Sequence, residues 1–227
     1  TGGKQRHRLT FAAIRPYKRS MTRIPCIIAM FVLFAALTAP VHAEYRITAR
    51  DRTDIARIEA YLNSLVSLRS KFVQSSGSRF AEGNIYMERP KKLRLEYTQP
   101  SNIQVYASGF WLAHVDTELE AVWHIPLKTT PASFLVRDRI RLSGDVTVRR
   151  VIRSANGLSV EIVKTAEPDA AKFLMTFTDK PLSLRKWLVT DAQGVSTSVT
   201  LVAPEYNVAI PQSVFVFDET KFERETQ

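Results

Sequence analysis

The stretch ERPKKLRLEYTQP, residues 88–100, alternates in the way that a half-buried β-strand does. Leu93, Leu95 and Tyr97 occupy every second position, and charged residues stand between them. Prolines stand near both ends of the stretch, where they bound a strand rather than interrupt it. The pattern predicts a strand with one apolar face, and the function depends on what that face contacts.

Period-two alternation continues along the chain beyond Phe72. The expected strands are Asn84–Glu88, Lys92–Thr98, Ile103–Ala107, Phe110–Val115, Ala121–Ile125, Val146–Arg153, Leu158–Lys164, Phe173–Thr178, Leu184–Thr190, Ser196–Val202 and Val214–Asp218. Turn sequences such as Ser108-Gly109 separate most of them, and connections this short force neighbouring strands to be antiparallel. About eleven strands are more than a twisted open sheet carries flat, so we expect the sheet to curl into an incomplete barrel.

Two helices are expected to cover the open side of that sheet. Residues 51–71 place apolar side chains at spacings of three and four, with Asp51, Thr53 or Asp54 available to cap the first turn. A second, short helix is expected over residues 130–136, where a threonine and a proline precede an apolar turn. The predicted fold class is mainly β, an incomplete antiparallel barrel with helices over its open side.

Residues 1–43 are predicted to be an upstream segment and a secretory signal peptide. Residues 1–23 carry seven basic side chains and no acidic one, and an apolar run over residues 24–37 follows them. That run is shorter than the roughly 20 residues that a membrane-spanning helix needs, and small residues place the cleavage site after Ala43. Residues 44–227 are expected to form one exported domain.

Export changes the meaning of the net charge. The chain has a net charge of +10, but seven of these charges lie within residues 1–43, which leaves +3 for residues 44–227. A surface this close to balance argues against nucleic acid as a partner. Cys26 is the only cysteine of the chain and lies in the export segment, so the exported domain is expected to have no disulfide or thiolate chemistry.

Sequence patterns for catalysis and metal binding are missing from the exported part. His114 and His124 each lie on an expected strand, and neither has further ligands at metal-binding spacing. The sequence has no G-x-S-x-G turn, Walker loop or dinucleotide-binding glycine loop. A serine triad assembled in space stays open as an alternative, and turnover of a generic ester would reveal it. We expect the chain not to be an enzyme and to use no metal or cofactor.

Several expected strands are apolar on both faces, for example at residues 110–113, 173–175 and 214–217. A half-barrel packed by its own side chains needs only one apolar face. An apolar second face requires either covering helices or a bound ligand. The residues alone leave both interpretations open.

Short motifs in chain order resemble those of one known family. They are Phe72-Val73-Gln74, Ala81-Glu82-Gly83-Asn84-Ile85-Tyr86-Met87, Arg89-Pro90, Leu93-Arg94-Leu95-Glu96-Tyr97, Gln99-Pro100, Ser108-Gly109 and Thr130-Pro131-Ala132-Ser133-Phe134-Leu135. The set resembles the periplasmic outer-membrane lipoprotein carrier family, LolA, although Leu95 stands where that family usually has an aromatic residue. The resemblance implies a helical lid over a hydrophobic cavity. It also implies a periplasmic chaperone that shields the acyl chains of lipoproteins and moves them from the inner to the outer membrane.

The resemblance further implies partners and site residues. The partners would be acylated lipoproteins, an inner-membrane lipoprotein-releasing ABC transporter and an outer-membrane lipoprotein acceptor, and the carrier itself would be a monomer. Arg89 would latch the lid, because its rigid fork of donors suits main-chain carbonyls. The acyl-chain lining would consist of Leu93, Leu95, Tyr97, Trp111, Trp123, Phe134 and Leu135.

The alternative function is that of a periplasmic regulatory protein with the same fold, which senses lipids or lipoproteins. Proteins of that kind usually carry a further C-terminal domain, for which residues 44–227 are expected to leave no room.

Overall fold

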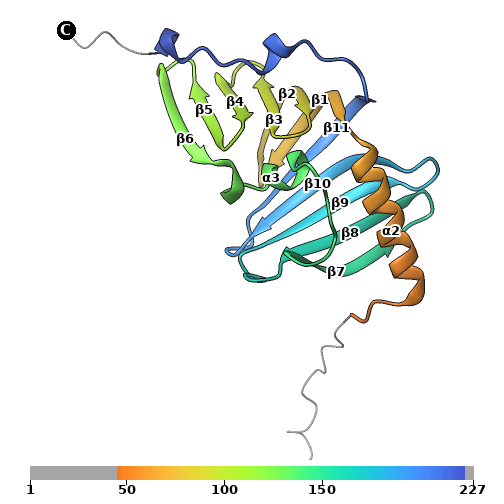
Figure 1. Ribbon diagram of the computed structural model, residues 1–227. Coiled ribbons are helices and arrows are strands. Elements are labelled where there is room, and N and C mark those ends of the chain that lie inside the picture. The colour runs from red at the N-terminus through yellow and green to blue at the C-terminus, as the bar shows by residue number, and fades with distance from the viewer. Residues whose placement is uncertain (1–44, 223–227) are drawn as a thin grey trace, which may run out of the picture. The chain divides into compact units, whose positions relative to one another are not determined.

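The computed structural model describes residues 45–222, and the predicted signal peptide, residues 1–43, lies outside the described residues. The described chain forms one sheet of eleven strands together with helices α2 (Ala49–Ser64) and α3 (Ala132–Val136) (Figure 1). None of its helices is long and apolar enough to span a membrane. This mainly β architecture, with a sheet that does not close, confirms the predicted fold class.

The strands follow the chain from Ser67 to Tyr206. They are β1 (Ser67–Ser76), β2 (Arg79–Glu88), β3 (Lys92–Tyr97), β4 (Ile103–Ser108), β5 (Trp111–Asp116), β6 (Ala121–Pro126), β7 (Val146–Arg153), β8 (Gly157–Lys164), β9 (Ala171–Thr178), β10 (Ser183–Asp191) and β11 (Ser196–Tyr206). The described part of the chain also has three short 3-10 helices: η2 (Leu127–Thr129) between β6 and α3, and η3 (Gln212–Phe215) and η4 (Glu219–Phe222) after β11.

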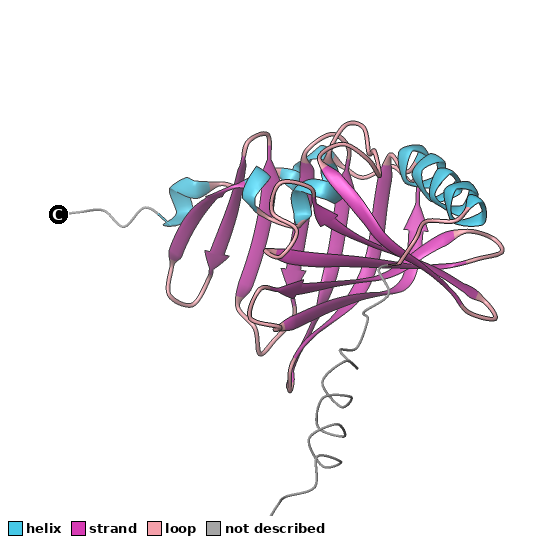
Figure 2. Ribbon diagram, turned by 90° about the horizontal axis from the view of Figure 1, so that it is seen from below, coloured by secondary structure: helices cyan, strands magenta, loops and turns pink. Residues whose placement is uncertain are grey.

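The strand order explains why a helix crosses the sheet. The order is β6-β5-β4-β3-β2-β1-β11-β10-β9-β8-β7, and every neighbouring pair is antiparallel. The chain therefore builds outward from β1 to the edge strand β6 and then passes to the opposite edge strand β7. Residues 127–145 make this passage, and α3 lies on it (Figure 1). Figure 2 shows how strongly the sheet that they cross is curved.

Strand β1 is absent from the sequence-based prediction, which continues the first helix to residue 71. The helix ends at Ser64, and its C-cap residue Leu65 already has an extended backbone. Apolar residues continue at helical spacing as far as Leu68, but Leu68 faces the core from a strand and is 1% exposed. β1 pairs with β2 on one side and β11 on the other, so the missed strand is the centre of the sheet.

The strand expected over residues 214–218 does not form. The segment is η3 followed by extended chain, and it is not among the paired strands of the described residues. The alternation itself is present, because Phe215 is buried whereas Val216 is 66% exposed. This incorrect strand and the missed β1 offset one another, which is why the predicted number of strands agrees with the observed number.

Helix α2 begins with a capping box, earlier in the chain than expected. Thr48, rather than Asp51, Thr53 or Asp54, is the N-cap residue. The Asp51 backbone N–H donates to the Thr48 hydroxyl oxygen at 3.2 Å, and the Thr48 N–H donates to Asp51 Oδ2 at 2.8 Å. The box satisfies two backbone N–H groups at the start of α2, and the helix then buries Ile58 completely.

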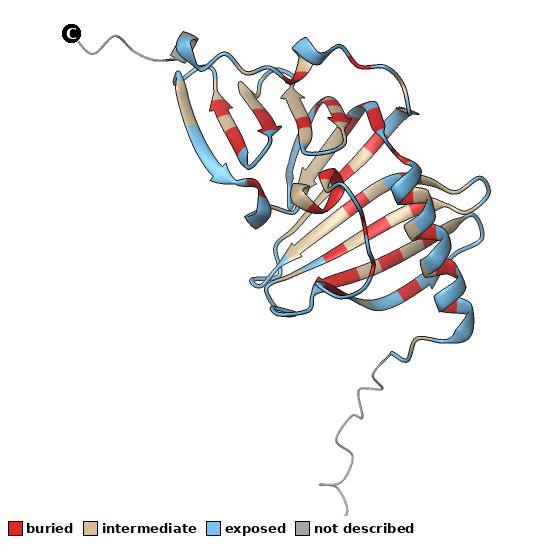
Figure 3. Cartoon of the chain, in the orientation of Figure 1, coloured by how far each residue is buried: buried red, intermediate tan, exposed pale blue. Residues whose placement is uncertain are grey.

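One face of the sheet packs against both helices. Opposed residues on paired strands share a face, so Phe72, Ile85 and Leu93 lie together on what we call the inner face. Leu62 of α2 and Phe134 of α3 join them in one buried cluster. Figure 3 shows buried positions alternating along the strands that α2 covers.

The C-terminal segment covers part of the opposite, outer face. Tyr106, Ala113 and Val115 form a small buried cluster there, and Phe217 packs against it. The Tyr106 and Phe217 rings lie 5.0 Å apart. The apolar residues at 214–217 are thus explained by this contact with the outer face.

Candidate functional site

The apolar residues of β3 face the interior of the domain. Leu93 is 3% exposed, and Leu95 and Tyr97 pack at the margin of the same buried cluster. The Tyr97 ring meets the Phe72 ring edge-on at 5.2 Å, and its hydroxyl donates to Gln74 Oε1 at 2.8 Å. Burial raises the pKa of Tyr97. In this structure these residues contact the protein's own side chains.

Helix α3 contributes the other side of that interior. Phe134 and Leu135 are each 6% exposed and belong to the same cluster as Leu93. The Phe134 ring lies 5.6 Å from the Phe173 ring of β9. A short helix therefore rests its apolar side chains on the inner face of the sheet.

Strand pairing separates the two expected lining tryptophans. Trp123 opposes His114 and lies on the inner face at the exposed edge of the sheet, where it is 48% exposed. Trp111 lies on the outer face, because Leu112 is the residue of β5 that shares a face with Leu93. The pairing therefore corrects the expected face of Trp111. An alternating pattern read one residue out of step inverts every face assignment.

Arg89 connects the ends of both helices. It lies between β2 and β3 and donates from Nε to the Leu135 carbonyl oxygen at 2.8 Å and from Nη1 to the Leu62 carbonyl oxygen. Both carbonyls belong to last helical turns, where the donors of the regular helical ladder are missing. The Leu62 carbonyl oxygen also accepts from the N–H of the C-cap residue Leu65 at 3.4 Å. Neither α2 nor α3 has a basic residue in its own last turn, so Arg89 supplies the cation that a helix C-terminus favours. Burial lowers the pKa of Arg89 to about 10, which leaves it charged at neutral pH.

The opposite end of α2 is held by a second arginine. Arg153 of β7 places Nη1 2.8 Å from Asp51 Oδ1 and donates from Nε to Asp54 Oδ2 at 2.7 Å. Asp51 is buried and Arg153 is partly exposed. From the sequence, Asp51 and Asp54 are expected only as helix caps, and no local pattern pairs them with an arginine about a hundred residues away.

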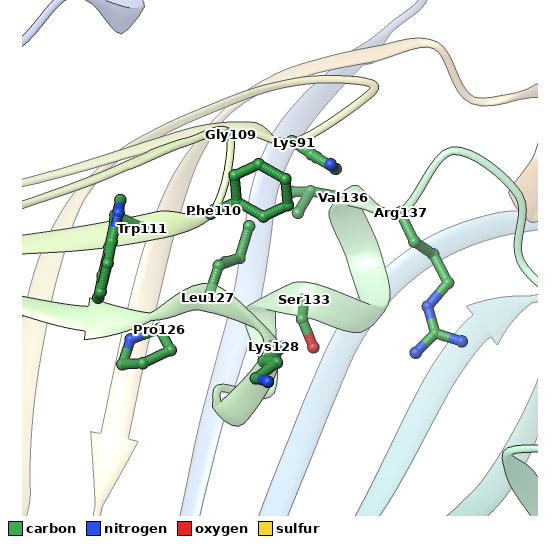
Figure 4. Close-up of a pocket in the computed structure, with 10 residues that line it drawn as sticks. All are labelled: Lys91, Gly109, Phe110, Trp111, Pro126, Leu127, Lys128, Ser133, Val136 and Arg137. Atoms are coloured by element: carbon green, nitrogen blue, oxygen red, sulfur yellow. The ribbon is translucent and has the colours of Figure 1, made fainter.

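Two cavities flank α3. Cavity 1, of about 580 Å³, lies on the side of β4–β6, and Figure 4 shows the ten residues that line it: Lys91, Gly109, Phe110, Trp111, Pro126, Leu127, Lys128, Ser133, Val136 and Arg137. Cavity 2, of about 250 Å³, lies on the side of β7–β10 and includes Phe134, Val146, Ile162, Ala171, Phe173 and Val189. Ser133 and Arg137 border both cavities. Volumes of about 300–1,000 Å³ are typical of ligand pockets, so cavity 1 by itself has room for a ligand.

Most residues of cavity 1 were not predicted as site residues. Trp111 is the exception, and it borders the cavity from the strand end. The available signal was proximity in sequence, because Leu127 and Lys128 precede the predicted 130–136 helix and Arg137 follows it. Within residues 45–222 no group of three or more histidine, cysteine or acidic side chains is arranged to hold a metal ion.

Comparison with known proteins places this fold in a family. The family described as "Outer membrane lipoprotein carrier protein LolA" matches residues 63–218. The chain belongs to the LolA family. The matched residues include all eleven strands and α3, and thus the whole LolA-family sheet with the crossing connection.

Two LolA-family relatives carry the same description, outer-membrane lipoprotein carrier protein. The protein from Methylobacillus flagellatus is 28% identical over 176 residues, which cover 72% of this chain and 83% of the relative. The protein from Methylococcus capsulatus is 33% identical over 78 residues, which cover 32% of this chain and 38% of the relative.

Solved structures with a similar chain path have low sequence identity. An uncharacterized conserved protein from Thermus thermophilus has a TM-score of 0.46 at 9% identity, covering 74% of this chain and 94% of that one. A chain of the Pseudomonas aeruginosa MucA/MucB complex has a TM-score of 0.44 at 13% identity, covering 74% and 61%.

Proposed function

We propose that this chain is a periplasmic carrier that binds the acyl chains of lipoproteins between α3 and the inner face of the sheet. The single observation that supports this most strongly is the position of α3. This short helix separates the two cavities, and it rests its apolar side chains on an apolar sheet face. Hydrocarbon that entered either cavity would meet Phe134, Phe173, Leu127 or Val136.

The lid in this proposal is α3 with its flanking connection, and Arg89 is its latch. Arg89 and the Lys91 backbone N–H together bond the last two carbonyl groups of α3, those of Leu135 and Val136. Displacing α3 would break these bonds and withdraw Phe134, Leu135 and Val136 from the buried cluster to which Leu93 belongs. In this proposal, movement of the lid makes the buried lining residues Leu93, Phe134 and Leu135 accessible, together with Leu95 and Tyr97 at the margin of the same cluster. Trp123 is already 48% exposed at the edge of the sheet.

A carrier must offset part of the free energy that it gains by burying the acyl chains of its cargo. Complete burial of one 16-carbon chain contributes about 12 kcal/mol of favourable binding free energy, at about 0.8 kcal/mol per CH₂. Three fully buried chains would contribute about 35 kcal/mol, well beyond the limit of about 18 to 21 kcal/mol for reversible binding. A carrier that releases its cargo must offset part of this gain. The packed interior and the Arg89 bonds, which cargo must displace, contribute such an offset.

The proposed route begins at an inner-membrane lipoprotein-releasing ABC transporter and ends at an outer-membrane lipoprotein acceptor. Export by the predicted signal peptide would bring the domain to the compartment between them. The lipoprotein carriers among its relatives support this assignment by their names, and the family membership is consistent with it.

The test uses a lipopeptide and a variant that fills a cavity. Isothermal titration calorimetry would compare a palmitoylated peptide with the same peptide lacking the acyl chain, and we expect only the first to bind. Ala171 lines cavity 2, so Ala171→Phe should weaken binding of the lipopeptide. Ala155→Phe, at an exposed turn position, is the matched control and should bind as the wild type does.

Equal binding of the two peptides, or equal behaviour of the two variants, would count against acyl-chain carriage. Native mass spectrometry of protein purified from its periplasm gives an independent measurement. Acylated polypeptide that co-purifies with the protein is the expected result.

A further inference from the structure

Cavity 1 combines an apolar body with a cationic rim. The apolar part comes from Phe110, Trp111, Pro126, Leu127 and Val136 (Figure 4). Three cationic side chains border the same space, and they are Lys91, Lys128 and Arg137. None of the ten lining residues, all of which lie in the described part of the chain, is acidic.

The three cations come from three separate segments. Lys91 belongs to the β2–β3 turn, Lys128 to η2 and Arg137 to the C-cap of α3. No single helical face or strand pattern produces this grouping, so the fold brings the charges together. Cations at the mouth of an apolar cleft raise the local concentration of anions, because the low-dielectric wall focuses the field.

Two of the cations are held against aromatic rings. Lys91 Nζ lies 4.4 Å from the centre of the Phe110 ring, and the Arg137 guanidinium lies 5.0 Å from the centre of the Phe134 ring. Arg137 Nη1 also donates to Asp145 Oδ2 at 2.8 Å. Asp145 is exposed, so solvent screens that pair, and a guanidinium has five N–H donors in all. Arg137 therefore keeps donors for a ligand.

Phe110 adds a second indication that something covers this cavity. It is 77% exposed although it is a large apolar residue, and it lies at the mouth between Lys91 and Leu127 (Figure 4). A ligand whose hydrocarbon part lay on Phe110 would remove this apolar surface from water.

We infer that cavity 1 binds an amphiphile with one anionic head group, such as a lysophospholipid, a phospholipid or a fatty acid. The head, a phosphate or carboxylate, lies between Lys91, Lys128 and Arg137, and the hydrocarbon lies on Phe110, Leu127 and Val136. This inference rests on the proposal that the space beside α3 accepts hydrocarbon. It adds a ligand class, because the ester and amide links that carry acyl chains on a lipoprotein are neutral and need no cationic rim.

The experiment compares two lipids that differ in head-group charge. Monomeric 1-palmitoyl lysophosphatidylglycerol, which is anionic, and 1-palmitoyl lysophosphatidylcholine, which is zwitterionic, are titrated below their critical micelle concentrations. We expect the anionic lipid to bind about tenfold more tightly, the scale of one or two exposed ion pairs. A third arm with palmitate separates a carboxylate head from a phosphate head.

The rim variant is Lys91→Gln/Lys128→Gln/Arg137→Gln, and it should bind the two lysolipids equally. The control Lys71→Gln/Arg149→Gln/Lys172→Gln removes the same charge from exposed positions outside cavity 1 and should keep the tenfold preference. Thermal unfolding of both variants checks their folding. Lys128→Glu, a single change at an exposed position, should reduce binding of the anionic lipid further than Lys128→Gln does.

Equal binding of the two lysolipids by the wild type would overturn the inference while leaving acyl-chain carriage intact. If the protein binds the lipopeptide but neither lysolipid, the inference about cavity 1 is overturned and acyl-chain carriage is not. If it binds none of the three ligands, both proposals are overturned. Rim-dependent binding of an unacylated acidic peptide, or binding only to anionic vesicles and not to monomeric lipid, would assign the cations to another partner and overturn it too.

Discussion

Arg153, the last residue of β7, places its Nη1 2.8 Å from Oδ1 of Asp51 in the first turn of α2. The pair fixes the N-terminal end of the helix to an edge strand. Arg89, in the turn between β2 and β3, instead donates to main-chain carbonyl oxygens at the C-terminal ends of α2 and α3. Each end of α2 is therefore held by an arginine from outside the helix, and the two contacts have different consequences.

Loss of the Arg153 contact should destabilise the fold. Arg153→Met leaves the buried Asp51 carboxylate without its cation, and we expect the free energy of unfolding to fall by about 2 to 3 kcal/mol. Urea denaturation gives this value. Arg150→Met on the same strand removes an exposed arginine that pairs with Glu161, so its cost should stay below about 1 kcal/mol. Similar costs for the two variants would contradict the anchoring role.

The same carboxylate predicts how stability depends on pH. The hydrogen bond from the Thr48 backbone N–H, with the Thr48 hydroxyl and Arg153, holds the pKa of Asp51 well below its usual value of 3.8. Since the folded-state pKa is depressed, the stabilisation is complete above the unfolded pKa and is lost as the pH falls below about 4. The difference in unfolding free energy between the wild type and Asp51→Asn, measured from pH 7 to pH 2, should be constant above about pH 5 and should shrink steadily below about pH 4, because the folded-state pKa lies well below the unfolded one. A difference that stays constant over this range would rule out the linkage.

Gly83 should tolerate no side chain. A Cβ at this position would lie 2.2 Å from the Glu96 carbonyl oxygen and 2.9 Å from the Phe72 ring. Gly83→Ala should therefore cost about 1 to 3 kcal/mol, the range for overpacking. Gly157→Ala is the control, because its nearest neighbour, at 2.7 Å, is the movable Ser154 hydroxyl. Chemical denaturation of both variants measures the loss of unfolding free energy. Equal losses for Gly83→Ala and Gly157→Ala would contradict the prediction.

Removal of the latch should alter cargo release more than folding. Arg89→Leu deletes the bonds to Leu62 and Leu135, which oppose displacement of α3 by cargo. The open, loaded state then becomes more stable relative to the closed, empty state. Release of a bound lipopeptide should therefore slow by about tenfold or more. Stopped-flow displacement measures the release rate, and hydrogen exchange should be faster for residues 132–136.

Two further variants separate the latch from a general effect of charge. Arg89→Lys keeps the charge but loses the rigid fork, so we expect an intermediate release rate. Arg79→Leu removes an exposed arginine at the start of β2 and should release cargo as the wild type does. Normal release by Arg89→Leu would refute the latch.

Most of the sheet could be predicted because apolar and polar residues alternate along many of its strands. The alternation of Leu93, Leu95 and Tyr97 marks β3 and its inner face. The boundary between α2 and β1 could not be predicted in the same way. Leu68 lies three residues after Leu65, which is helical spacing, and four residues before Phe72, a separation that fits both a helix and a strand. Tertiary pairing with β2 and β11 decides that boundary.

The candidate site was only partly predictable for a related reason. Arg89 was predicted through a resemblance that covers its motif, and the structure gives it two carbonyl acceptors. The face of Trp111 depends on a single step of register, which the sequence does not fix. The cationic rim joins Lys91, Lys128 and Arg137 across the topology of the sheet, and no local pattern records such a grouping.

The sheet that begins at β6 and finishes at β7 is a ribbon with two free margins in the described chain. A closed β-barrel has a fixed circumference, and it can widen only if main-chain hydrogen bonds between two strands break. An open ribbon would keep its main-chain ladder bonds as its edges spread, and the contacts that would have to break are those with α2, α3, their arginines and the C-terminal segment. An open sheet of this kind would therefore accommodate a larger ligand by a change in its curvature, without loss of strand pairing.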